Sequence, residues 1–215
     1  RLPYALVDKI NELHEDEEVY RLGLRIVSHM YLKARGLAAA TGLTVTLEES
    51  PAESAARRFA KVDLREYPES AAVVKGNREK DQYYYTNSIH FAAAAPVSLS
   101  ERIDKQARFH TLIESGAIIH AFVGEKKPEA GAILDLVTKT WEKTKAAQLT
   151  ISPEFTICRD CSVTARGLKP SCPSCGSPRV FGLSRVVGYF SRIDNWNRSK
   201  QGELNARQAG NYAIG

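Results

Sequence analysis

The four cysteines of this chain form two C-x-x-C pairs within residues 158–175. Cys158 pairs with Cys161 and Cys172 with Cys175, and the sequence contains no other cysteine. Two such pairs in one short window can present four thiolates as a tetrahedron, which is the geometry of a structural Zn²⁺ site. A glycine follows the second pair, where the chain must turn. The spacing predicts a Cys₄ zinc ribbon, in which no ligand position stays open for a substrate.

Other uses of these cysteines have to be weighed against zinc. Two disulfides or a redox dithiol would suit an oxidising compartment or a thioredoxin-like βαβ unit, and the surrounding sequence has no such unit. Iron in the same thiolate cage is the main alternative. With either metal, the cluster explains how a small domain folds and does not itself supply a reaction.

Composition restricts the classes of protein to which the chain can belong. Of its 215 residues, 43% are hydrophobic and 26% are charged, which is ordinary for a globular protein. No apolar run approaches the roughly 18 residues that span a bilayer, so we expect a cytoplasmic protein without a membrane segment. The net charge of +5 is modest and its signs are interleaved, which argues against a nucleic-acid groove. Because the chain opens at Arg1 in a helical pattern, we expect a fragment, a processed chain or an isolated domain.

Helical and strand patterns alternate up to about residue 150, which predicts an α/β fold. Ser98 and Glu101 have the spacing of a capping box ahead of one helix. Beyond residue 147, Cys, Pro and Gly cluster, so we place a domain boundary near Thr150. The expected helices are two within 4–40, broken near 15–17, one within 50–63, one over 99–116 and one from Pro128, and the expected strands are 42–49, 81–91 and 117–124.

A glycine lies in the middle of an apolar stretch near the C-terminus. The segment SRVVGYF is typical of a buried strand, but Gly188 interrupts it. Glycine weakens a strand, so it usually marks a bulge, a close backbone approach or a need for a bare Cα. A glycine Cα–H can lose a hydrogen atom to give a radical that is delocalised over both neighbouring peptide groups. For VVGY alone, a bulge is the favoured interpretation.

With the ribbon in front of it, RVVGYF resembles the glycyl-radical motif of the anaerobic (class III) ribonucleoside-triphosphate reductases. Other segments resemble the C-terminal catalytic region of that family in the same order, and the resemblance covers nearly the whole chain. Formate-lyase-type glycyl-radical enzymes share the radical motif but lack the ribbon, so the ribbon selects the reductases. The segments are SPAESAARRFAKVD, YYYTNSIHF, FHTLIESGAIIHAFVGE and NWNRSKQGEL.

The resemblance implies an architecture and a reaction. Residues 1–150 would be the C-terminal part of a ten-stranded α/β barrel, 151–180 the Cys₄ zinc ribbon, and 181–215 the glycyl-radical loop and C-terminal tail. The reaction would be anaerobic reduction of ribonucleoside triphosphates to deoxyribonucleoside triphosphates for DNA replication. An activating enzyme that carries AdoMet and a 4Fe-4S cluster would remove a hydrogen atom from Gly188. The radical would then pass to a cysteine thiol, which attacks the ribose 3′ hydrogen.

The chain departs from the family's whole enzyme in one respect that matters for catalysis. The family's thiyl cysteine lies on a loop inside the barrel, whereas every cysteine of this chain belongs to one of the two C-x-x-C pairs, the knuckles of the predicted ribbon. The family's N-terminal ATP-binding region is missing as well. We therefore expect an N-terminal portion or subunit to supply the thiyl cysteine, and the resemblance implies that the complete enzyme is a homodimer.

The segment EESPAESAAR is the first candidate for contacts with the nucleotide. A turn that ends at a helix N-terminus offers free N–H groups to a triphosphate, with Ser50 and Ser54 as hydroxyl donors. By resemblance to the family's active-site glutamate, Glu53 would be a general acid or base at the ribose hydroxyls. The alternative is an ordinary helix start, in which Glu53 complements the helix dipole.

The segment YTNS is a second candidate. Thr86, Asn87 and Ser88 close a predicted strand, which is where ligand contacts gather in α/β folds.

A different class of function, a zinc-ribbon binding module without catalysis, also fits the cysteines alone. Against it, the ribbon lacks the basic and aromatic face that such a module needs to bind nucleic acid.

Overall fold

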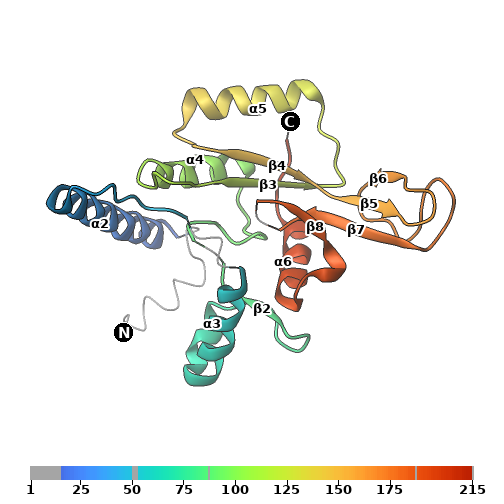
Figure 1. Cartoon of the computed structure of the whole chain (residues 1–215), viewed down its shortest axis with the longest axis horizontal. Helices are drawn as coiled ribbons and strands as arrows, with labels where there is room; N and C mark the ends of the chain where they lie inside the picture. Colours follow the sequence, from blue (N-terminus) through green and yellow to red (C-terminus); the bar gives the residue numbers. More distant parts are fainter. Residues whose placement is uncertain (1–15, 50–52, 87, 187, 215) are drawn as a thin grey trace.

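The computed structural model describes residues 16–49, 53–86, 88–186 and 188–214 (Figure 1). Helices and short strands alternate along it, and the strands form three small sheets rather than one large one. Within the described part, no helix is both long enough and apolar enough to cross a membrane. In chain order, the elements are α2 Glu17–Thr41, α3 Glu53–Glu66, the 3₁₀ helix η2 Pro68–Ala72, β1 Lys75–Asn77, β2 Gln82–Tyr84, α4 Leu99–His110, β3 Ile119–Gly124, α5 Ala130–Lys143, β4 Leu149–Pro153, β5 Phe155–Cys158, β6 Thr164–Arg166, β7 Val180–Arg185, β8 Phe190–Arg192, the 3₁₀ helix η3 Ile193–Asn195 and α6 Arg198–Ala209.

A parallel pair of strands carries the main hydrophobic core. β3 pairs in parallel with β4, and α5 connects the two strands. Ile119 and Ala121 of β3 are 0% exposed, because Leu99 and Ile103 of α4 pack against them together with Tyr212. A parallel pair joined by a helix is the repeating unit of α/β folds, so the predicted α/β class is confirmed. The closure of such units into a ten-stranded barrel stays a prediction.

A four-stranded antiparallel sheet, in the order β6-β5-β7-β8, follows this core (Figure 1). At one end of β7, Val180 pairs with Cys158 of β5, beside the cysteine pairs. At the other end, Arg185 pairs with Phe190 of β8. The six residues of β7 therefore connect the cysteine region to the turn that contains Gly188.

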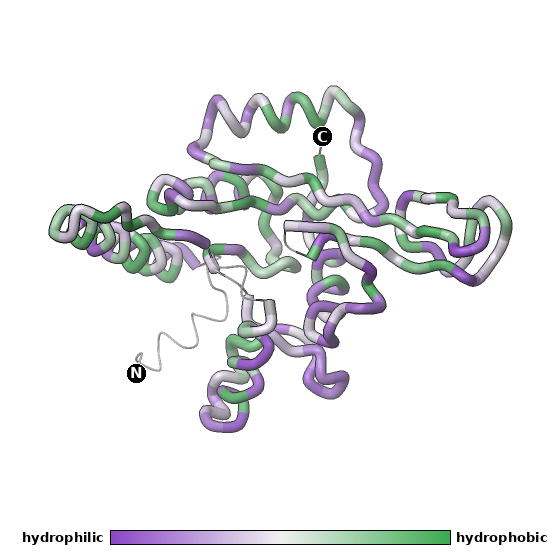
Figure 2. The backbone as a smooth tube through the Cα atoms, in the orientation of Figure 1, coloured by the Kyte–Doolittle hydropathy of each residue, from purple (hydrophilic) through white to green (hydrophobic). Residues whose placement is uncertain are grey.

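Helix α6 is predominantly hydrophilic, as its purple colour in Figure 2 shows, and it nevertheless packs against β2 and β3. Lys200 and Arg207 are only 6% and 3% exposed. Asn197 caps the helix by accepting a hydrogen bond from the Lys200 N–H, 3.0 Å away. Because buried charges need partners, this helix must carry an internal polar network.

One predicted strand is wrong, and another is shorter than expected, because only Gln82–Tyr84 of the predicted strand 81–91 is a strand among the described residues. Residues 42–49 form no strand, although Ser115 N–H donates to the Leu47 carbonyl at 2.9 Å and Glu49 N–H donates to the Gly116 carbonyl at 3.0 Å. Two hydrogen bonds do not make a ladder, and the described residues supply no further pairing for this segment. The contacts do hold Glu49 beside the start of β3.

Other local predictions agree with the structure more closely. Asp16 caps α2, which begins at the predicted break, and the Ser98 hydroxyl accepts from the Glu101 N–H at 3.2 Å at the start of α4. Helix α4 ends at His110, before the predicted stop at Gly116. Helix α5 forms where expected, and Trp141, on its predicted apolar face, is 55% exposed.

Candidate functional site

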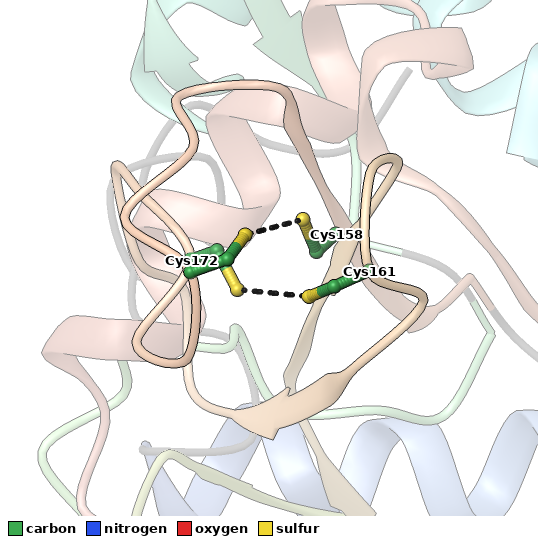
Figure 3. Close-up of side chains that lie close together, drawn as sticks. Cys158, Cys161 and Cys172 are labelled. Atoms are coloured by element: carbon green, nitrogen blue, oxygen red, sulfur yellow. Dashed lines mark hydrogen bonds between the residues drawn. The ribbon is translucent and has the colours of Figure 1, made fainter.

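The four cysteine side chains converge between the two knuckles of the ribbon (Figure 3). Their Sγ atoms all lie within 4.8 Å of one another. The Cys158 and Cys175 sulfurs are 3.7 Å apart, and the Cys161 and Cys172 sulfurs are 3.5 Å apart. A Zn–S bond of about 2.3 Å makes each edge of a ZnS₄ tetrahedron about 3.8 Å long. The arrangement therefore fits a tetrahedral metal ion.

Backbone N–H groups prepare the knuckles for thiolates. Asp160 N–H donates to Cys158 Sγ and Ser174 N–H donates to Cys172 Sγ, each over 3.4 Å. The N–H groups of Cys175 and Ser174 lower the pKa of the Cys172 thiol to about 6. At Cys161 and Cys175, the N–H groups of Val163 and Ser177 also lower the pKa, but the neighbouring thiols outweigh them and raise the pKa, at Cys161 to about 12. Since a metal binds the deprotonated sulfur, these donors favour the form that a metal needs.

Each knuckle turns through a residue in the left-handed region directly after its second cysteine. Gly176 has a φ of +74°, and Ser162 has a φ of +59° at the equivalent place of the first knuckle. Glycine adopts this conformation without strain, whereas serine rarely does. The two C-x-x-C pairs therefore fold alike although only one of them ends in glycine.

Gly188 lies in the tight connection between β7 and β8. Val186 N–H donates to the Tyr189 carbonyl over 2.9 Å, which closes the connection. The Arg185 side chain donates to the Gly188 carbonyl over 2.8 Å. Gly188 is exposed, and a Cβ added to it would meet no described atom within 4 Å beyond its chain neighbours. Neither a bulge inside a ladder nor a close approach of described atoms explains why this residue is glycine.

Gly188 also lines a cavity of about 310 Å³. The cavity wall is built by the segments around β2, the polar face of α4, the chain leading into β3, helix α6 and Tyr212. Thr86 Oγ1, Gln106 Oε1 and His120 Nδ1 of this wall are buried and have no hydrogen-bond partner among the described residues. Buried polar atoms without partners are rare, so this cavity suits a polar ligand.

One wall of the cavity carries a buried carboxylate. Glu49 Oε1 lies 2.9 Å from His90 Nε2, and Glu49 Oε2 accepts from the Ile118 N–H at 3.1 Å. Burial would raise the pKa of Glu49, but His90 and the Ile118 N–H together hold it below its usual value. Burial also lowers the pKa of His120 to about 3, so this imidazole is neutral. The wall therefore presents an ionised carboxylate beside a neutral histidine.

The opposite charges come from α6. Glu203 Oε2 lies 2.7 Å from Lys200 Nζ, and Glu203 Oε1 accepts from Arg207 Nη2 at 2.6 Å. Burial would raise the pKa of Glu203, but Arg207 and Lys200 outweigh it and lower the pKa. All three side chains line the cavity, so it is bordered by an ionic triad that carries one net positive charge.

Of the residues predicted to contact substrate, Thr86 lines the same cavity as Gly188, whereas Ser54 and Ser88 do not line it. Ser54 is exposed on α3. Ser88 is also exposed, has a φ of +52°, and helps to lower the pKa of Glu49. Glu53 begins α3. Ser50, Asn87 and the side chain of Glu53 lie outside the described residues.

Sequence reasoning missed the residues that make the cavity polar. Glu49 ends a segment that was predicted to be a strand, and its neighbour Glu48 gives the same local signal while being exposed. Glu203 and Arg207 have the i,i+4 spacing of an ordinary surface pair on a polar helix. No local pattern distinguishes such a buried pair from an exposed one, since the burial comes from strands distant in the sequence.

Comparisons with known proteins agree on one family. A family model described as "Anaerobic ribonucleoside-triphosphate reductase" matches residues 5–209. The reductases of Haemophilus influenzae and Escherichia coli are 25% and 26% identical to the chain over 94% of its length, and the alignments cover 29% of each of those proteins. A solved anaerobic ribonucleotide reductase superposes with a TM-score of 0.70 at 20% identity, over 91% of this chain and 29% of that one. The Thermotoga maritima enzyme in complex with dATP and CTP superposes with a TM-score of 0.67 at 19% identity, over 87% of this chain and 28% of that one.

The chain thus spans less than a third of the length of these relatives. The family model nevertheless extends from before α2 to the last residue of α6, across both the cysteine ribbon and the turn at Gly188. The fold shared with a solved reductase likewise covers most of the chain. This chain belongs to the anaerobic ribonucleoside-triphosphate reductase family.

Proposed function

We propose that this chain is the radical-storing part of an anaerobic reductase that converts ribonucleoside triphosphates to deoxyribonucleoside triphosphates. Gly188 would hold the unpaired electron, and a zinc ion on Cys158, Cys161, Cys172 and Cys175 would stabilise the ribbon behind it. The observation that carries the proposal is that Gly188 lines a polar cavity although packing among the described residues does not require glycine there.

The proposed activation step concerns one bond. A radical-AdoMet activating enzyme with a 4Fe-4S cluster supplies the radical that takes a hydrogen atom from Gly188. The Cα–H bond breaks homolytically, and the remaining electron is delocalised over the two flanking peptide groups. A side chain would crowd this planar centre, so glycine is the suitable residue.

Reduction of the ribose needs a thiol, and this chain has no cysteine outside the cluster. All four cysteines lie in the metal cluster, where each sulfur is within 4.8 Å of the others. The thiyl cysteine would come from the remaining portion of the reductase. Its S–H bond would give a hydrogen atom to the Gly188 radical, which forms the thiyl radical, and the thiyl radical would take a hydrogen atom back from Gly188 when turnover ends, which restores the glycyl radical. Two electrons per turnover would come from a formate or thioredoxin-type donor that acts on that portion.

The nucleotide would contact both portions. Thr86 supports this, because its buried hydroxyl lacks a described partner and faces the cavity that Gly188 lines. Ser50, Ser54, Asn87 and Ser88 are proposed as further contacts, and Glu53 as the general acid or base. We also propose the division into barrel (1–150), ribbon (151–180) and radical loop with tail (181–215), in a cytoplasmic homodimer.

Electron paramagnetic resonance tests the role of Gly188. After anaerobic activation of the complete reductase, we expect a doublet signal that is lost in Gly188→Ala. The variant should fold normally, because a Cβ at this position meets no described atom within 4 Å. Air should cleave the activated wild-type chain at Gly188, which mass spectrometry of the fragments would detect.

Gly131→Ala is the matched control, since a Cβ there also meets no described atom within 4 Å. It should keep the doublet. A doublet that survives in Gly188→Ala would overturn the assignment. Its absence from the wild-type protein, with the cognate activating enzyme present, would favour a zinc-ribbon binding module without catalysis.

A further inference from the structure

We propose that Arg207 is a positioning residue that holds the Gly188 turn against the cavity. This inference rests on the proposed function of Gly188, because the turn needs a fixed position only if a radical is exchanged there. The network of charges on α6 gives it its physical basis.

Arg207 reaches from α6 to the strand end that leads into the turn. Its Nη1 donates to the Arg185 carbonyl at 2.6 Å, and its Nη2 donates to the Val186 carbonyl at 3.0 Å. Arg185 is the last residue of β7, and Val186 is the first residue of the connection between β7 and β8. One guanidinium thus binds two successive peptide groups at the base of the turn.

Arg207 is itself immobilised. Its Nε and Nη2 donate to Glu203 Oε1 at 3.1 and 2.6 Å, and Lys200 occupies the other oxygen of that carboxylate. The guanidinium carbon lies 4.1 Å from the centre of the Phe122 ring, and only 3% of the residue is exposed. A planar group with fixed donors and a packed face has one orientation, so it can transmit position to what it binds.

The turn needs such a clamp because side-chain packing holds only its first residue. Val186 is 6% exposed and lies in a hydrophobic cluster with Trp196 and Leu204, whereas Gly188 has no side chain and Tyr189 is 59% exposed. The part of the turn at Gly188 is therefore held through backbone groups: the closing bond from Val186 to Tyr189, the Arg185 contact with the Gly188 carbonyl, and the Arg207 clamp. A misplacement of about 1 Å can cost about 100-fold in rate, so hydrogen transfer at Gly188 depends on this clamp.

Hydrogen exchange of the 215-residue chain tests the clamp without any radical. In Arg207→Lys and Glu203→Gln, we expect the amides of residues 185–190 to exchange at least about tenfold faster, as the loss of a charge-assisted hydrogen bond implies. The amides of β5 and α4 should be unchanged. Arg198→Met is the matched control on the same helix, because Arg198 is exposed and does not contact the turn.

The same variants are then measured in the complete reductase. We expect the doublet to form and kcat to fall by about 100-fold, with a much smaller change in the KM for the nucleotide. Unchanged exchange at 185–190, or an equal rise across β5 and α4, would overturn the inference, since Arg207 would then be irrelevant or merely structural. If the wild-type protein lacks the doublet but the variants show faster exchange at 185–190, only the proposed function of Gly188 would be contradicted.

Discussion

Individual glycines of this chain are required for different physical reasons. A Cβ at Gly210 would lie 2.2 Å from the Ala93 carbonyl oxygen, and one at Gly202 would lie 2.8 Å from the Gln82 carbonyl oxygen, so packing demands glycine at both places. Gly188 has no such neighbour among the described residues. Packing among the described residues therefore does not explain Gly188, for which we propose a chemical role.

Glu49 is the residue whose removal tests the cavity wall. Glu49→Ala leaves the buried Ile118 N–H without its acceptor and removes the His90 contact, so we expect a loss of about 1–3 kcal/mol in the free energy of unfolding. Urea unfolding of the chain measures this. Glu48→Ala is the control, because Glu48 is exposed and should change stability by less than about 0.5 kcal/mol. Equal effects of the two substitutions would contradict the placement of Glu49.

Among the elements, β7 couples the two functional features of the chain. Its first residue pairs with Cys158, and its last residue pairs with Phe190 across the turn at Gly188. The same strand contacts β4 of the core. We therefore expect that a metal bound to the ribbon would also order the turn, because the paired strands of the ladder link the two.

Removal of the metal tests this coupling. We expect one zinc per chain by elemental analysis, and a chelator that strips it should speed hydrogen exchange in β5, β7 and the turn while α4 stays protected. Cys161→Ser should weaken zinc binding by more than about 100-fold, since even outer-shell partners are worth about 10- to 100-fold. Ser171→Ala, in the same ribbon and exposed, should bind zinc normally. Iron in place of zinc, or exchange that rises in the knuckles alone, would contradict the prediction.

At the scale of the whole molecule, buried histidines make folding sensitive to acid. Burial lowers the pKa of His110 from 6.5 to about 4 and that of His120 to about 3. The unfolded chain therefore binds more protons than the folded chain below pH 6.5. This stability is complete above pH 6.5 and is lost as the pH falls toward 4, by about 1.4 kcal/mol per pH unit for each histidine.

Urea unfolding between pH 7.5 and 5.5 measures this dependence. His120→Phe keeps a ring on Phe122 and removes one titrating group, so the loss of stability with falling pH should become shallower. His29→Gln removes an exposed histidine and should leave the slope as it is. A slope that His120→Phe does not change would show that His120 is not buried in the neutral form.

The sequence by itself determined the cysteine cluster, the cap of α4 and the presence of most helices. These features depend on spacing over a few residues: two C-x-x-C pairs, a serine three residues before a glutamate, apolar residues at helical intervals. The same kind of local pattern gave a wrong prediction at residues 42–49. Their alternating sequence predicts a strand, but no strand pairs with this segment among the described residues. Local pattern reports what a segment can form, and pairing requires a second segment.

Only the tertiary structure decided which polar residues face Gly188. Gln106, Glu49 and Arg207 lie on elements far apart in the sequence and meet at one cavity because α4, the start of β3 and α6 pack around it. From its spacing in the sequence, Arg207 would be predicted to form a surface ion pair. In the structure it also donates hydrogen bonds to the carbonyl groups of Arg185 and Val186. Because the Glu203–Arg207 pair is buried, it can hold the turn in place, and burial depends on the packing of the whole chain rather than on any one segment.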